Sequence, residues 1–129
     1  MNDNYFINEA LLLAQQAFNE DEVPVGAIIV LDQKIIGRGY NTKEKTNSVI
    51  QHAEINAIQD AQVSLNDWRL NGATMYSTLE PCPMCAGAIL HARIKRLVFT
   101  AFDLKWGAVS TKANLFEKNI FKSSSDFKS

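Results

Sequence analysis

The spacing of hydrophobic positions alternates between helical and extended patterns along the chain. Residues 5–20 carry apolar side chains three and four positions apart, which predicts an amphipathic helix. Two runs rich in Val and Ile follow at residues 25–31 and 34–40. We expect two strands there, joined by a tight hairpin turn at Asp32 and Gln33.

The second half of the pattern repeats this alternation. A helical pattern begins at Ala53 and breaks at Asn66-Asp67, residues 73–79 read as a strand, Cys82 to about Ala92 as a helix, and residues 97–102 as a strand. Residues 42–50 are polar and predict a loop. Residues 110–118 favour a helix, and the tail after about 119 has no clear period. Such alternation is typical of an α/β layered domain, and residues 1–129 suffice for one domain.

Composition indicates a soluble protein, with 47% hydrophobic and 21% charged residues. The N-terminus lacks the basic start of a signal peptide. The longest apolar run, around residues 23–31, falls far short of the roughly 20 residues that cross a bilayer. We therefore expect a cytoplasmic protein with no membrane segment.

Two cysteines and one histidine carry the candidate chemistry. Cys82 and Cys85 are the only cysteines, and with His52 they supply one nitrogen and two sulfurs, which zinc prefers. The other histidine, His91, lies about 240° around a helix from Cys85 and would face away. Three protein ligands leave the fourth zinc position open, as in catalytic zinc sites.

Glu54 is the candidate proton carrier. It lies two residues after His52, so the two side chains share a site only if His52 sits at the transition into a helix and Glu54 in its first turn. A carboxylate there can accept and return protons during hydrolysis. The alternative role is a helix-terminal carboxylate that stabilises the helix dipole. The whole pattern, H-x-E…P-C-x-x-C, is the signature of zinc nucleobase deaminases.

Further stretches strengthen this resemblance. They are Glu22-Val-Pro-Val-Gly26, Gly39-Tyr-Asn41, Leu79-Glu-Pro-Cys-Pro-Met-Cys-Ala-Gly-Ala-Ile89 and Asp103-x-Lys105-x-Gly107-Ala108. With the zinc motif, they resemble the cytidine-deaminase-like superfamily and, within it, the bacterial tRNA-specific adenosine deaminases. The resemblance implies a three-layer α/β/α domain with a central mixed sheet of four to five strands. It also implies one Zn²⁺ per subunit, a homodimer, and conversion of adenosine to inosine at the wobble position of a tRNA anticodon stem-loop.

The resemblance also assigns substrate contacts. It implies that Asn41 and the backbone of Ala53 contact the base, and that Asp103 and Lys105 contact the anticodon loop; a plain turn residue is the alternative for Asp103. The matching pattern stops near Ala108, so we expect a shortened C-terminus with a short or absent fifth strand. Residues 87–129 carry a net charge of +5 against −6 for residues 1–86, which favours an RNA-facing surface or merely a solvated one.

Three other functions compete with this prediction. A free-base deaminase acting on guanine or cytosine would share the zinc site and Glu54. A non-catalytic RNA-binding subunit with a deaminase fold would be expected to lack Glu54. A redox module in which Cys82 and Cys85 cycle as a disulfide leaves His52 and Glu54 unexplained.

Overall fold

The computed structural model describes residues 2–109, which fold as helices on a central sheet. The elements in chain order are α1 (Asp3–Asn19), β1 (Gly26–Leu31), β2 (Lys34–Tyr40), α2 (Lys43–Thr46), α3 (Ala53–Leu65), β3 (Thr74–Ser77), α4 (Pro83–His91) and β4 (Arg96–Phe99). In this part of the chain, no helix combines the length and the apolar character that crossing a membrane requires.

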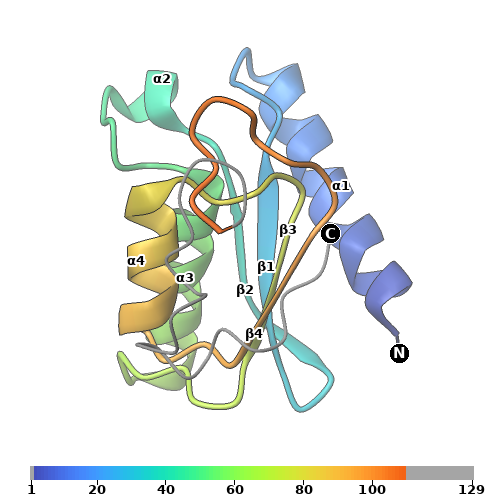
Figure 1. Cartoon of the computed structure of the whole chain (residues 1–129), viewed down its shortest axis with the longest axis vertical. Coiled ribbons are helices and arrows are strands. Elements are labelled where there is room, and N and C mark those ends of the chain that lie inside the picture. The colour runs from blue at the N-terminus through green and yellow to red at the C-terminus, as the bar shows by residue number, and fades with distance from the viewer. Residues whose placement is uncertain (1, 110–129) are drawn as a thin grey trace.

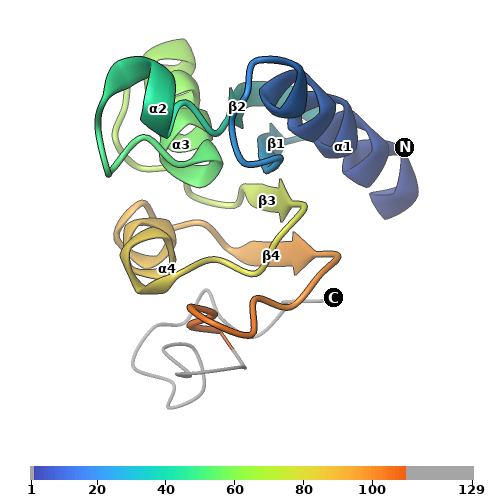
Figure 2. The ribbon, with the colours of Figure 1, turned by 90° about the horizontal axis from the view of Figure 1, so that it is seen from above.

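The sheet is mixed, and its strand order is β2-β1-β3-β4. Strand β1 is antiparallel to both β2 and β3, whereas β3 and β4 are parallel. Helix α1 covers one face, and α3 and α4 cover the other (Figures 1 and 2). The predicted three-layer α/β/α architecture with a mixed sheet is therefore confirmed. The expected two-residue hairpin is present as well, with Asp32 and Gln33 both at positive φ.

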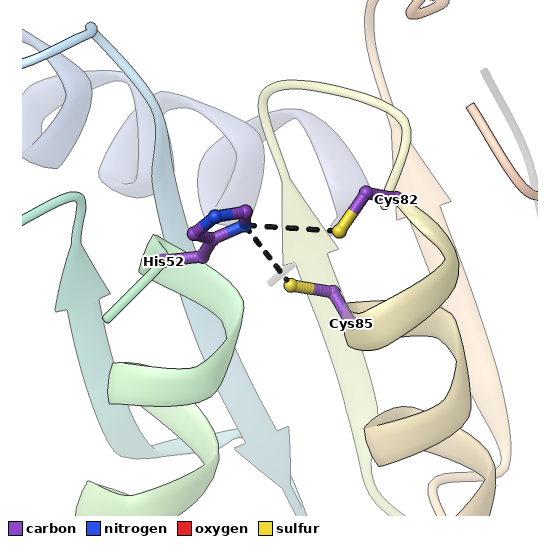
Figure 3. A group of neighbouring side chains, drawn as sticks. All are labelled: His52, Cys82 and Cys85. Carbon is purple, nitrogen blue, oxygen red and sulfur yellow. Dashed lines mark hydrogen bonds between the residues drawn. The ribbon is translucent and has the colours of Figure 1, made fainter. Parts of the chain in front are cut away.

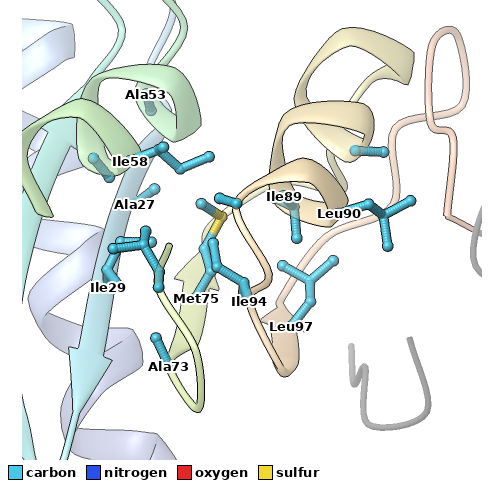
Figure 4. Packing of buried hydrophobic residues seen from close by; sticks show 14 of the residues in the cluster. Ala27, Ile29, Ala53, Ile58, Ala73, Met75, Ile89, Leu90, Ile94 and Leu97 are labelled. Carbon is cyan, nitrogen blue, oxygen red and sulfur yellow. The ribbon is translucent and has the colours of Figure 1, made fainter. Parts of the chain in front are cut away.

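Both faces of the sheet are packed, because alternate side chains of a strand point to opposite sides. The face under α1 is filled by Phe6, Ile28, Val30, Tyr76 and Val98. The face under α3 and α4 carries a larger cluster that includes Ala27, Ile29, Met75, Ile89 and Leu97 (Figure 4). Burial on both faces explains why the central strands read as continuous apolar runs.

Helix α3 lies unusually close to strand β2. A Cβ at Gly39 would overlap the backbone of Ala53 and Ala57, and a Cβ at Gly37 would overlap the backbone of Ala57 and Ala61. Glycine at two alternate positions of β2 therefore lets the helix backbone rest against the strand. This contact fixes the first turn of α3, which carries His52 and Glu54.

Three local predictions need correction. Residues 42–50 contain the one-turn helix α2, whose backbone N–H groups at Glu44 and Lys45 donate to the distant carboxylate of Glu22. Strand β3 ends at Ser77, because the Ser77 hydroxyl bonds the Leu79 carbonyl and the chain turns toward α4. Strand β4 ends at Phe99 instead of 102. The predictions for residues 110–129, including the shortened C-terminus and fifth strand, lie outside the described residues.

Candidate metal centre and pocket

Two helix N-termini bring the predicted metal ligands together. His52 is the N-cap residue of α3 and Cys82 the N-cap residue of α4; Cys85 lies in the first turn of α4. Pro83 occupies the start of α4, where its missing N–H costs nothing. The expected placement of His52 at the transition into a helix, with Glu54 in the first turn, is therefore confirmed.

The three ligand atoms lie at distances that suit a zinc ion. Nδ1 of His52 is 3.7 Å from Sγ of Cys82 and 3.5 Å from Sγ of Cys85 (Figure 3). Tetrahedral zinc with ordinary Zn–S and Zn–N bonds separates such atoms by about 3.6 Å. Among the described residues, the candidate metal cluster contains these three and not His91, which is exposed. The donor set and its spacing both fit zinc.

Electrostatics favours one thiolate in this cluster. A hydrogen bond from Cys85 lowers the pKa of Cys82 to about 5, and the nearby His52 acts in the same direction. The pKa of Cys85 is raised, first because its thiol donates that bond and then because it is buried. The helix N-terminus also favours negative charge at both sulfurs. A thiolate is the form that binds a metal.

Glu54 lies beside the cluster with its side chain buried. It is 4% exposed, and burial raises the pKa of its carboxyl group to about 7; the charges at Cys82 and Asp103 act in the same direction. A pKa near neutral suits a group that must both accept and donate a proton. Stabilising a helix dipole would not require such burial.

One cavity of about 500 Å³ joins these groups to the surface. Glu54, His52 and Cys82 line it together with three of the predicted substrate contacts, Asn41, Ala53 and Asp103. The volume falls in the range of small-molecule sites. Six of the predicted site residues therefore line one pocket, and Cys85, which is buried, joins the metal cluster without lining it. Lys105 is exposed and is not among the residues that line the pocket.

The geometry of the predicted substrate contacts is specific. Asn41 Nδ2 donates to the carbonyl of Val23 at 3.3 Å, and Asn41 Oδ1 accepts the N–H of Lys43 at 3.0 Å. These bonds hold the amide at the pocket wall and leave one donor and one acceptor site on it. Ala53 occupies the first helical position of α3, where a backbone N–H has no partner within its own helix.

Asp103 is a turn residue that also lines the pocket. Its Oδ1 accepts the N–H groups of Lys105 and Trp106, both at 3.0 Å, as a turn residue does. The same residue lines the cavity and contributes to the raised pKa of Glu54. A structural role for Asp103 is therefore observed, while a contact with RNA stays a prediction.

Several pocket residues escaped the sequence analysis. They are Val23, Lys43, Val49, Glu80, Met84 and Trp106. Glu80 precedes the ligand cysteines and Met84 lies between them within the matched motif. Trp106 stands at an unspecified position of Asp103-x-Lys105-x-Gly107, so the motifs marked the neighbourhood of all three residues. Val23 lies in the matched stretch Glu22-Val-Pro-Val-Gly26, whereas Val49 carried no such signal, because the fold brings it to the pocket from a separate loop.

Comparison with known proteins places this site in a family. The model of the cytidine and deoxycytidylate deaminase zinc-binding region matches residues 1–101. The chain is 44% identical over 119 residues to the tRNA-specific adenosine deaminase of Bacillus subtilis, covering 92% of this chain and 74% of that protein. It is 48% identical over 114 residues to the chloroplastic tRNA(adenine(34)) deaminase of Arabidopsis thaliana, covering 88% of this chain but only 9% of that protein.

Solved structures agree with the sequence comparisons. A chain from a study of A-to-I editing by tRNA:A34 deaminases superposes with a TM-score of 0.92 at 42% identity, covering 98% of both chains. A guanine deaminase from Bacillus subtilis superposes with a TM-score of 0.77 at 32% identity, covering 87% of this chain and 82% of that one. With a matching model over most of its length and a zinc-type ligand set at the predicted residues, the chain belongs to the deaminase family of the cytidine and deoxycytidylate deaminase zinc-binding region.

Proposed function

We propose that this chain is a zinc-dependent hydrolase that converts adenosine to inosine at wobble position 34 of a tRNA anticodon. The observation that carries the chemistry is a buried carboxylate, Glu54, which lines the same pocket as His52 and Cys82, two members of the cluster that Cys85 completes. Support for the substrate comes from relatives at 44% and 48% identity that are tRNA adenosine deaminases, and from the superposition with a tRNA:A34 deaminase.

In this proposal His52, Cys82 and Cys85 hold the zinc ion. Bound zinc supplies the nucleophile at neutral pH, because it lowers the pKa of water. Cys82 at the N-cap of α4 and Cys85 one turn later meet His52 from the N-cap of α3, so the two helices fix the ligands from opposite sides. His91 takes no part.

Glu54 moves the protons of the reaction. As the water oxygen bonds to C6 of adenine, the Glu54 carboxylate accepts a water proton and passes it to N1 of the ring. A second proton then goes from the new hydroxyl group through Glu54 to the amino group, which leaves as ammonia. The sum is adenosine and water giving inosine and ammonia. Burial suits Glu54 to both steps, because its raised pKa makes either protonation state accessible near pH 7.

Asn41 and Ala53 would orient the base over Glu54. Both line the cavity, and hydrogen bonds between the Asn41 side chain and the backbone of Val23 and Lys43 hold its amide in place. The proposal includes Asp103 and Lys105 as contacts to the anticodon loop, with Asp103 at the pocket and Lys105 on the exposed side of the same segment.

The proposed assembly and location follow from the same resemblance. We expect a homodimer working in the cytoplasm on the anticodon stem-loop. Light scattering would then give twice the 14.4 kDa mass of the chain. A mass of one chain at the concentrations used for activity would remove the dimer from the proposal and leave the chemistry standing.

The deciding experiment incubates the purified protein with an anticodon stem-loop RNA carrying adenosine at the wobble position. Guanine, cytosine and cytidine serve as parallel substrates, and Glu54→Gln, which keeps the side-chain volume, is the control. We expect inosine in the RNA and a loss of about 10²- to 10⁴-fold in the variant. Ammonia from guanine without inosine in the RNA would instead favour a free-base deaminase, an outcome worth testing because a guanine deaminase shares the fold at 32% identity.

A further inference from the structure

The segment that follows β4 is held rigidly at the pocket by two carboxylates. Glu80 accepts the N–H of Asp103 at 3.2 Å and that of Val109 at 3.1 Å, so it ties both ends of the segment together. Asp103 in turn accepts the N–H groups of Lys105 and Trp106. A Cβ at Gly107 would overlap the Glu80 carboxylate, so glycine is required for this close approach. The backbone of Trp106 is therefore fixed. Figure 1 shows this segment in orange, at the end of the molecule where α4 begins.

The indole of Trp106 stands at the mouth of the pocket and not in the core. It lines the same cavity as Glu54 and His52, yet 59% of the residue is exposed. The Nζ atom of Lys105 lies 6.0 Å from the centroid of its ring. An aromatic ring held in this way presents a flat apolar surface toward whatever enters the cavity.

The rest of the mouth shares this chemistry. Val23, Val49 and Met84 line the cavity and are 61%, 72% and 36% exposed. Lys43 and Asp103 also line it, so apolar surface is combined with one cation and one carboxylate, beside the buried Glu54 and the metal ligands His52 and Cys82. Apolar and aromatic groups beside cations are how proteins hold unpaired bases and their phosphates. A free base bound beside Glu54 would leave this mouth unused.

We propose that Trp106 is a binding subsite on which an unpaired base adjacent to the target adenosine stacks. The subsite rests on the proposed function, since it requires an RNA whose target base enters this pocket. Lys105, next to the ring, lies where it can meet the backbone phosphate of the stacked nucleotide. Because stacking reads the face of a base and not its edge, Trp106 contributes affinity with little preference among bases.

The test is a double-mutant cycle between protein and RNA. Wild type and Trp106→Ala are assayed for inosine formation on the intact stem-loop and on two RNAs with an abasic nucleotide, one on the 5′ side and one on the 3′ side of the wobble adenosine. We expect Trp106→Ala to raise KM on the intact RNA roughly 5- to 150-fold, the factor for one stacked base. With one of the two abasic RNAs, KM of the wild type should rise by the same factor. With that same RNA, Trp106→Ala should show no further rise in KM.

Matched variants separate stacking from a structural role. Trp106→Phe should recover most of the affinity, and Trp68→Ala removes the other tryptophan, which is exposed and lies outside the pocket, without effect. If the loss from Trp106→Ala multiplies with the loss from each abasic RNA, the protein and RNA changes act independently. That result would overturn the stacking subsite and leave the proposed function standing. If wild type forms no inosine in the intact RNA, the proposed function fails as well, so the two failures are distinguishable.

Fluorescence provides a direct readout of the ring. With Trp68→Phe, Trp106 is the only tryptophan in the chain. Adding Glu54→Ala prevents turnover, and we then expect the intact RNA to quench the emission more strongly than the abasic RNA that failed in the cycle. Emission that is already typical of a buried indole and does not respond to RNA would mean that Trp106 is covered in solution, which contradicts the proposal.

Discussion

Glu54 is a single residue whose burial should be visible in the pH dependence of stability. Its pKa in the folded protein, about 7, lies above the ordinary value of 4.5, so the folded state binds this proton more tightly than the unfolded state. In metal-free protein the free energy of unfolding should therefore fall as the pH rises from 4.5 through 7, by up to about 3 kcal/mol for this group. Above pH 7 the loss is complete.

Glu54→Gln should remove this loss. We compare the free energy of unfolding of the variant with that of wild type, measured by urea unfolding after chelation of the metal. Between pH 4.5 and pH 8 this difference should shift in favour of the variant by up to about 3 kcal/mol. The lowered pKa of Cys82 acts in the opposite direction, but it does so in both proteins and largely cancels in the comparison. A constant difference between the two proteins from pH 4.5 to 8 would show that Glu54 is solvated.

The two histidines of the chain differ in what surrounds them. His52 Nδ1 faces both cysteine sulfurs, whereas His91 is exposed at the end of α4. We expect His52→Ala to lose its zinc on dialysis and His91→Ala to retain about one ion per chain, measured by elemental analysis. Equal zinc loss in both variants would mean that His91 joins the site and that the fourth position is not open to water.

At the scale of elements, the contact between β2 and α3 positions the first turn of the site. A Cβ at Gly39 would overlap the backbone at Ala53 and Ala57, which cannot move without shifting His52 and Glu54. We expect Gly39→Ala to lower the free energy of unfolding by about 1–3 kcal/mol or more and to weaken zinc binding. Chemical denaturation and zinc titration would measure the two effects.

Gly87→Ala is the matched control for this prediction. At Gly87, in α4, no described atom lies within 4 Å of an added Cβ, and alanine in a helix is favoured over glycine by up to about 1 kcal/mol. This variant should keep its zinc affinity and unfold at the same or a higher denaturant concentration. If Gly39→Ala behaved like Gly87→Ala, the helix would not be held by its contact with the strand.

The elements also show where sequence patterns stop being informative. Periodicity located α1, α3, α4 and the four strands, because burial on one or both faces leaves a repeating apolar signal. It missed α2, whose first turn is organised by the Glu22 carboxylate some twenty residues away. It also missed Glu80, whose partners are backbone N–H groups of Asp103 and Val109 and so leave no trace in residue types. The metal ligands were predictable because their chemistry is in the side chains themselves.

At the scale of the whole molecule, charge is divided unevenly along the chain. Residues 87–129 carry a net charge of +5, although the chain as a whole carries −1. Not every basic group in that half is available to a partner: Arg96 is ion-paired with Asp3 at 2.6 Å in the layer between α1 and the sheet. Lys105 is exposed, and Lys43 from the other half lines the pocket. An RNA bound at the pocket would therefore meet a surface that offers Lys43 and Lys105 on a protein that is nearly neutral overall.

This surface makes salt a probe of the substrate class. Contacts with unpaired RNA weaken with salt in proportion to the phosphates neutralised, and three such contacts would raise KM for the stem-loop about 20-fold between 50 and 200 mM salt. Lys105→Ala should reduce the slope of log KM against log salt concentration by the amount expected for about one phosphate contact. Lys34→Ala, at the hairpin end of β2, should leave this slope unchanged. Deamination of a free base would depend only weakly on salt, because no phosphate is bound. A flat KM for RNA would mean that the basic residues serve solubility and that the pocket recognises the base alone.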